Sequence, residues 1–73
     1  MTAPTITSPT PLTARQQHIL QAVADGDTHA EIADALFITE TAVGSTLTYI
    51  RTKLRATNTP NAVATALRKR IIT

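Results

Sequence analysis

Hydroxyl-bearing and basic side chains are concentrated in one stretch of this sequence, residues 41–55. The first half, TAVGSTLT, offers the hydroxyls of Thr41, Ser45 and Thr48 and no charge. The second half is basic, with cations at Arg51, Lys53 and Arg55. Guanidinium and ammonium groups bind phosphates, and short hydroxyl side chains can hydrogen-bond to phosphates or base edges. The stretch could therefore recognise DNA bases, bind only the DNA backbone, or bind a different kind of partner.

Other kinds of chemistry have little support in the sequence. His18 and His29 each lack a second ligand three or four positions later, so we expect no metal site. The chain has no cysteine, and 73 residues are too few to enclose a deep substrate pocket. We therefore expect no catalytic residue, no cofactor and no small-molecule substrate, and a protein that is not an enzyme.

The formal net charge of +2 is unevenly distributed along the chain. All acidic residues lie at or before position 40, and every charged residue beyond that position is basic. A chain polarised in this way can present one basic face to a polyanion while its acidic half points away. Uneven charge also arises by chance in small proteins, so charge alone leaves the kind of partner open.

The first ten residues, MTAPTITSPT, are rich in threonine and proline. This composition predicts a disordered or extended arm, or a linker, at residues 1–10, followed by one domain at residues 11–73. The N-terminus lacks the features of a signal peptide, and no stretch approaches the roughly 20 apolar residues that span a bilayer. We therefore expect a soluble, cytoplasmic protein with no membrane contact.

Threonines mark the expected starts of four helices. Thr13 and Thr28 each stand three residues before a Gln or Glu, the pattern of a capping box. Thr39 can cap a third helix, and Thr59 can cap a fourth with proline at its first position. Together with the apolar spacing, these caps predict helices at about residues 14–25, 29–36, 40–55 and 60–70.

Each expected helix carries apolar residues at helical spacing, and together these would form the core. The predicted core residues are Ile19, Leu20, Val23, Ile32, Ala33, Leu36, Val43, Leu47, Ile50, Leu54, Val63, Ala66 and Leu67. Gly26 is expected to end the first helix. Only Phe37, Ile38 and Thr39 join the second and third helices, so these must cross sharply, as in a helix-turn-helix. We expect Phe37 and Ile38 to anchor this turn to the core.

Four segments follow a known pattern in order and spacing. They are LTARQQHIL at 12–20, DGDTHAEIADAL at 25–36, ITETAVGSTLTYIRTKL at 38–54 and NAVATALRKRII at 61–72. In these segments the chain resembles the LuxR-type helix-turn-helix domain of bacterial response regulators and quorum-sensing activators. The resemblance implies an all-α, four-helix fold and a small transcriptional regulator that binds double-stranded DNA.

In the LuxR-type family the third helix enters the major groove and the fourth commonly mediates homodimerisation. Carried over to this sequence, the resemblance implies that the third helix, residues 40–55, meets the bases and phosphates of DNA. The DNA-binding residues expected on this basis are Thr28, Thr39, Thr41, Gly44, Ser45, Thr48, Arg51, Lys53 and Arg55. The dimerisation residues expected are Val63, Thr65, Ala66 and Arg68.

The sequence departs from the family pattern at several cations. Gly44 and Ala30 stand where lysine is frequent, Thr46 where histidine is frequent, and Thr59 where an arginine is common. Gly44 could let the helix backbone approach DNA or a partner closely, or it could be an exposed position without a role. The sequence does not separate these two interpretations.

The missing cations motivate an alternative function with the same fold. In this alternative the domain is a protein-interaction module that binds another regulator or the transcription machinery instead of DNA. The last domain of a bacterial sigma factor is a related possibility, because it shares the LT…R start and the helix-turn-helix. The match in the fourth helix favours the LuxR type.

Overall fold

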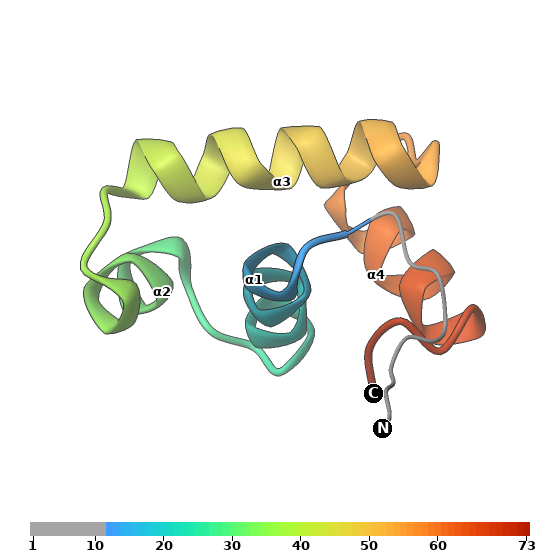
Figure 1. The fold of residues 1–73 in the computed structure, drawn as a ribbon, viewed down its shortest axis with the longest axis horizontal. Coiled ribbons are helices and arrows are strands. Elements are labelled where there is room, and N and C mark those ends of the chain that lie inside the picture. The colour runs from blue at the N-terminus through green and yellow to red at the C-terminus, as the bar shows by residue number, and fades with distance from the viewer. Residues whose placement is uncertain (1–11) are drawn as a thin grey trace, which may run out of the picture.

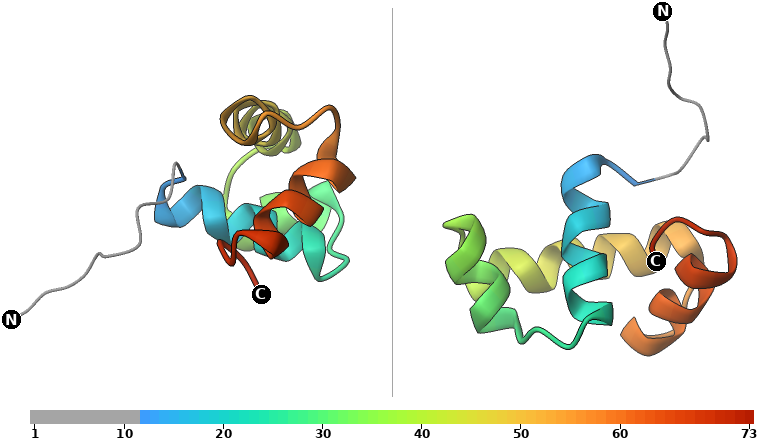
Figure 2. Two further views of the ribbon diagram at one scale, coloured as in Figure 1. Left: turned by 90° about the vertical axis from the view of Figure 1, so that its right-hand side faces the viewer. Right: turned by 90° about the horizontal axis from the view of Figure 1, so that it is seen from below.

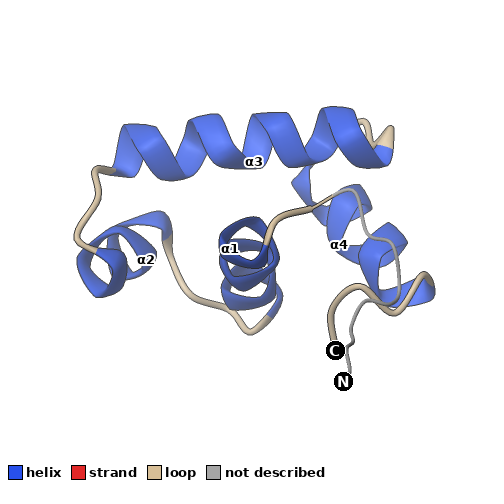
Figure 3. Cartoon of the chain, in the orientation of Figure 1, coloured by secondary structure: helices blue, strands red, loops and turns tan. Residues whose placement is uncertain are grey.

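The computed structural model describes residues 12–73. The arm expected at residues 1–10 lies outside the described residues, as does Pro11. All regular structure in the described part of the chain is helical (Figure 3), in the order α1 (Ala14–Ala24), α2 (His29–Leu36), α3 (Glu40–Leu54) and α4 (Thr59–Arg68). The expected all-α class is therefore confirmed, and the predicted helix ends differ from the observed ones by two residues at most.

The longest helix, α3, lies across the other three (Figure 1). α2 packs near its N-terminal end, α4 near its C-terminal end, and α1 crosses beneath it between them, as the view from below shows (Figure 2). α3 contacts each of the other helices, whereas α2 and α4 do not contact each other. One side of α3 is thus committed to the core and the other is left to solvent.

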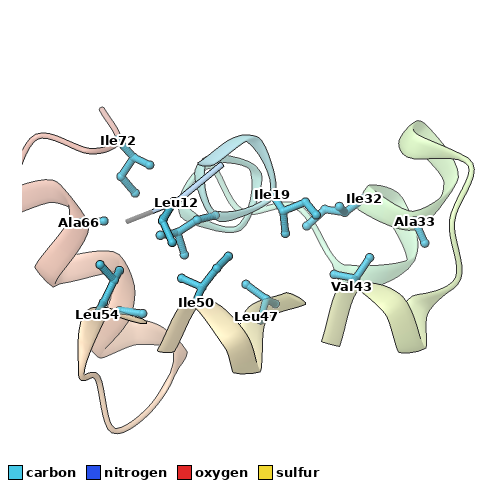
Figure 4. Packing of buried hydrophobic residues seen from close by; sticks show 12 residues of the cluster. Leu12, Ile19, Ile32, Ala33, Val43, Leu47, Ile50, Leu54, Ala66 and Ile72 are labelled. Carbon is cyan, nitrogen blue, oxygen red and sulfur yellow. The ribbon is translucent and has the colours of Figure 1, made fainter. Parts of the chain in front are cut away.

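The core is built around that inner side of α3 (Figure 4). Val43, Leu47, Ile50 and Leu54 are all buried, and they point toward apolar side chains of the other elements. The buried residues that meet them are Leu12, Ile19, Leu20, Ile32, Ala33, Ala62, Ala66 and Ile72. Removing this apolar surface from water is the main stabilising contribution in a domain of this size.

Two predicted core residues are exposed instead. Phe37 ends α2 in the left-handed conformation, with φ 58°, and its side chain is 94% exposed. The chain reverses direction there, so only Ile38, which is partly buried, packs this turn against the core. On α4, Leu67 is 44% exposed and Thr65 is buried. The expectations that Phe37 anchors the turn and that Leu67 belongs to the core are therefore wrong.

Three of the four predicted helix caps are confirmed. The amide of Gln16 donates to Thr13 Oγ1 at 3.2 Å, and Gln16 Oε1 accepts from the Thr13 amide at 2.9 Å. Thr28 and Glu31 form the same pair of bonds at 3.1 and 2.7 Å. Thr39 Oγ1 accepts from an amide in the first turn of α3 at 3.0 Å. Each cap satisfies a backbone donor that the helix itself leaves free.

The fourth cap is Asn58, so the assignment of Thr59 to this role is wrong. Asn58 Oδ1 accepts from the amide of Asn61 at 2.8 Å, which places Thr59 and Pro60 inside the first turn of α4. Asparagine is at least as good an N-cap as threonine. The hydroxyl of Thr59 is thereby left for a different partner.

The C-terminal tail is bound against α1, a feature that the sequence did not predict. Gln17 Nε2 donates to the carbonyl of Ile71 at 2.9 Å, and the amide of Thr73 donates to Gln21 Oε1 at 2.8 Å. Ile72, between these two bonds, is buried in the core. The tail therefore closes the core on the side away from α3.

Candidate nucleic-acid interface

The side of α3 opposite the core carries a stripe of hydroxyl-bearing residues. Thr41, Ser45, Thr48 and Thr52 recur at steps of four, three and four, and all are exposed. At 100° per residue these steps keep them on one side of the helix, as the core residues are kept on the other. We call these four residues the hydroxyl stripe. Beyond Glu40, the first residue of α3, the helix carries no acidic side chain.

Arg51 lies beside the stripe in a fixed position. Its Nη2 donates to Thr48 Oγ1 at 3.3 Å and its Nη1 donates to Thr59 Oγ1 at 3.4 Å. The side chain of Arg51 is half-buried. Because its two hydrogen bonds reach different helices, the guanidinium joins α3 to the first turn of α4. The family resemblance leads one to expect an arginine at position 59, and here the guanidinium of Arg51 occupies the vicinity of Thr59 instead.

The hydroxyls of the stripe fall into two classes. Thr48 donates to the carbonyl of Gly44 and Thr52 donates to the carbonyl of Thr48, both at 3.1 Å. The side chains of Thr41 and Ser45 make no hydrogen bond within residues 12–73, so their hydroxyls can bind a ligand without breaking one. The free hydroxyls thus lie in the N-terminal half of α3.

The remaining cations of α3 lie near its C-terminal end. Lys53 is exposed, and its Nζ lies 5.3 Å from the centroid of the Tyr49 ring. Because Arg51 and Lys53 are two positions apart, they leave the helix on opposite flanks of the stripe. Arg55 is exposed and ends the helix with φ 55°. These three cations would therefore surround a polyanion that lay along this end of α3.

The predicted contacts outside the stripe are spread over several elements. Thr28 and Thr39 are exposed, but each hydroxyl already accepts a capping bond at the start of its helix. Gly44 is half-buried, and no heavy atom lies within 4 Å of a Cβ built there. The space beside the backbone of Gly44 is open to a ligand.

The predicted dimerisation residues on α4 differ in exposure. Thr65 and Ala66 are buried by their own chain, so they offer no surface to a second copy. Val63 is half-buried, and Arg68 is exposed, with its Nη2 donating to Thr65 Oγ1 at 3.3 Å. The exposed Leu67 adjoins them and was not among the predicted contacts.

Two further kinds of site are absent from the described part of the chain. Within residues 12–73 no three side chains among His, Asp and Glu lie close enough together to hold a metal ion. None of the helices in this range has the length and apolar character to traverse a membrane.

Residues 10–66 match the model of a protein family described as bacterial regulatory proteins, luxR family. The match includes α1, α2, α3 and most of α4, and it covers more than half of the chain. A search of curated proteins found no match to the sequence.

Proposed function

Because the chain belongs to the LuxR family of bacterial regulatory proteins, we propose that it regulates transcription by binding specific sequences in double-stranded DNA. In this proposal α3 enters the major groove with the hydroxyl stripe facing the bases. A major groove about 12 Å wide accepts an α-helix with its side chains.

The observation that carries the proposal is the outer side of α3 itself. This side is exposed, free of acidic side chains beyond Glu40, and flanked by Arg51, Lys53 and Arg55. The half-buried Arg51 supports it further, because two hydrogen bonds hold its guanidinium in place before any ligand arrives. A cation that is already ordered loses less side-chain entropy on binding phosphate.

The residues of the interface divide between base and backbone contacts. In this proposal Ser45 and Thr48 meet the base edges, and Gly44 lies beside them without a side chain of its own. Phosphates would be contacted by the three cations of α3 and by the hydroxyl groups of Thr28, Thr39 and Thr41. Phosphate contacts supply affinity and position, and base contacts supply sequence preference.

We further propose that the protein acts as a cytoplasmic homodimer on DNA. The surface for a second copy would be the exposed part of α4, with Val63, Leu67 and Arg68. A two-fold symmetric dimer places two copies of α3 on one side of the duplex, so its binding site would be an inverted repeat.

A second candidate function is binding to a protein partner, and it is favoured by one observation. Phe37, at the turn between α2 and α3, is 94% exposed, and an aromatic side chain in this state is a possible anchor for an apolar surface. This candidate predicts partner binding that depends little on salt, and no affinity for duplex DNA above background.

Selection of duplexes from random-sequence DNA at near-physiological salt tests the proposal. We expect the purified 73-residue chain to enrich an inverted repeat, and Arg51→Glu, checked for its fold by circular dichroism, to enrich none. Ser45→Ala should change the preferred sequence, whereas Arg51→Ala should weaken binding to all duplexes alike. If the native chain enriches no sequence over Arg51→Glu, the proposal is wrong and a protein partner becomes the better candidate.

A further inference from the structure

The side chain of Thr48 ends in two groups, a hydroxyl and a γ-methyl, and the hydroxyl is already engaged. It donates its single proton to the carbonyl of Gly44 at 3.1 Å and accepts from Arg51 Nη2 at 3.3 Å. A threonine hydroxyl has one proton to donate, so this one has none left for a base. Thr48 is nevertheless exposed at the middle of the hydroxyl stripe.

The hydroxyl can offer a base one remaining lone pair and no proton, so the γ-methyl is the main group of Thr48 left for a new contact. The two hydrogen bonds to Gly44 and Arg51 also fix the torsion about the Cα–Cβ bond, so the methyl is held in one position. A fixed apolar group on the outer side of α3 is a poor match for a phosphate and a good match for another apolar group.

In the major groove, the apolar group on a base edge is the 5-methyl of thymine. We propose that Thr48 recognises thymine through contact between its γ-methyl and that 5-methyl, while its hydroxyl keeps Arg51 in place. This inference rests on the proposed function, because it requires α3 to lie in the major groove. It assigns one requirement to the binding site, a thymine opposite Thr48 in each half-site.

The test uses a duplex recovered from the random-sequence selection and remade with deoxyuridine at one thymine position at a time. Deoxyuridine keeps the hydrogen-bonding groups of thymine and lacks only the 5-methyl. Loss of one buried methyl contact should lower the affinity of the native chain roughly fourfold at one position of each half-site. Deoxyuridine at the other positions should have a smaller effect.

Two substitutions separate the methyl from the hydroxyl. Thr48→Ser keeps both hydrogen bonds and removes the methyl, so it should bind the thymine and deoxyuridine duplexes equally well. Thr48→Val keeps a methyl and removes the hydroxyl, so it should still distinguish them. Thr13→Ser, the same chemical change at the cap of α1, should behave as the native chain does, because serine caps a helix as well as threonine.

The outcomes distinguish this inference from the proposed function. If the native chain selects a sequence but no deoxyuridine position weakens binding, or if Thr48→Ser still distinguishes the two duplexes as the native chain does, the methyl contact is refuted and the DNA-binding proposal stands. If the native chain selects no sequence over Arg51→Glu, both are refuted.

Discussion

Replacement of Gly44 by alanine should raise the free energy of unfolding by about 1 kcal/mol, the usual difference between these residues inside a helix. Gly44 is the fifth residue of α3, and its backbone is helical. A Cβ built there meets no heavy atom within 4 Å, so the methyl fits without displacing a neighbour. The substitution therefore removes the entropic cost of glycine and adds no steric cost.

Thermal and urea unfolding followed by circular dichroism measure this change. In a domain of this size, 1 kcal/mol corresponds to a rise in Tm of about 4–8 °C. Gly26→Ala is the matched control, because a Cβ at Gly26 also meets nothing within 4 Å but the backbone there has φ +99°. Gly26→Ala should lower the stability. An unchanged or lower stability for Gly44→Ala, or a gain for both variants, would refute the reasoning.

A lysine at position 44 tests the electrostatic part of the same argument. Gly44→Lys should stabilise α3 nearly as much as alanine does, and it adds a cation about two helical turns before Arg51 on the same side of the helix. One more phosphate contact in each protomer of the proposed dimer should make the slope of log affinity against log salt more negative by about 0.9 per protomer. Comparison with Gly44→Ala removes the effect of helix stability, and we expect alanine itself to leave DNA affinity nearly unchanged. Weaker DNA binding by Gly44→Ala would instead show that the helix needs a bare backbone there.

Three further predictions concern the ends of the helices and the tail, and equilibrium unfolding measures each of them. Asn58→Ala removes the cap of α4 and should lower the free energy of unfolding by about 1 kcal/mol, so an unchanged stability would contradict the assignment of this cap. Phe37→Gly relieves a left-handed backbone at an exposed side chain and should raise stability by up to about 1 kcal/mol, and a loss would indicate that Phe37 packs somewhere. Ile72→Ala should lower stability by about 2–5 kcal/mol, and a loss below this range would mean that the tail is not part of the core.

The sequence predicted the parts of the fold that depend on neighbouring residues. Thr13 and Thr28 were found because a capping box needs only residues three positions apart, and both boxes are present. The start of α4 was misplaced by one residue because Asn58 and Thr59 are adjacent and both residue types can cap a helix. In the structure Asn58 is the cap, and the hydroxyl of Thr59 accepts from Arg51 of another helix.

The errors at Phe37 and Leu67 have different causes. Leu67 is exposed because the buried side of α4 carries Ala62, Thr65 and Ala66. For Phe37, at the end of α2, the turn geometry decides which way the side chain points. α2 ends with Phe37 in the left-handed conformation, and the amide of Ile38 then donates to the carbonyl of Ala33 at 3.0 Å. This closing bond is typical of helix C-termini, where glycine is the usual left-handed residue. Because phenylalanine stands in that place, no residue type in the sequence marks the reversal.

The candidate interface was predictable as a surface but not as a set of free groups. Helical spacing alone places Thr41, Ser45 and Thr48 opposite the core residues of α3. It does not say which hydroxyls are free, because that depends on whether each one bonds to the preceding turn or to a distant side chain. The bonds of Thr48 to Gly44 and Arg51 are visible only in the structure.

The division of α3 into two halves makes its two proposed roles separable by experiment. The core residues on its inner side contact all three other helices, so the orientation of its outer side is fixed by the fold. The cations lie from Arg51 onward, and the N-terminal half beyond Glu40 carries only uncharged side chains. Phosphate contacts set the salt dependence of binding, whereas base contacts set its sequence preference. Removal of the charge at Arg51, Lys53 or Arg55 should therefore change the salt dependence with little change in preferred sequence, and uncharged substitutions at Ser45 and Thr48 should do the reverse.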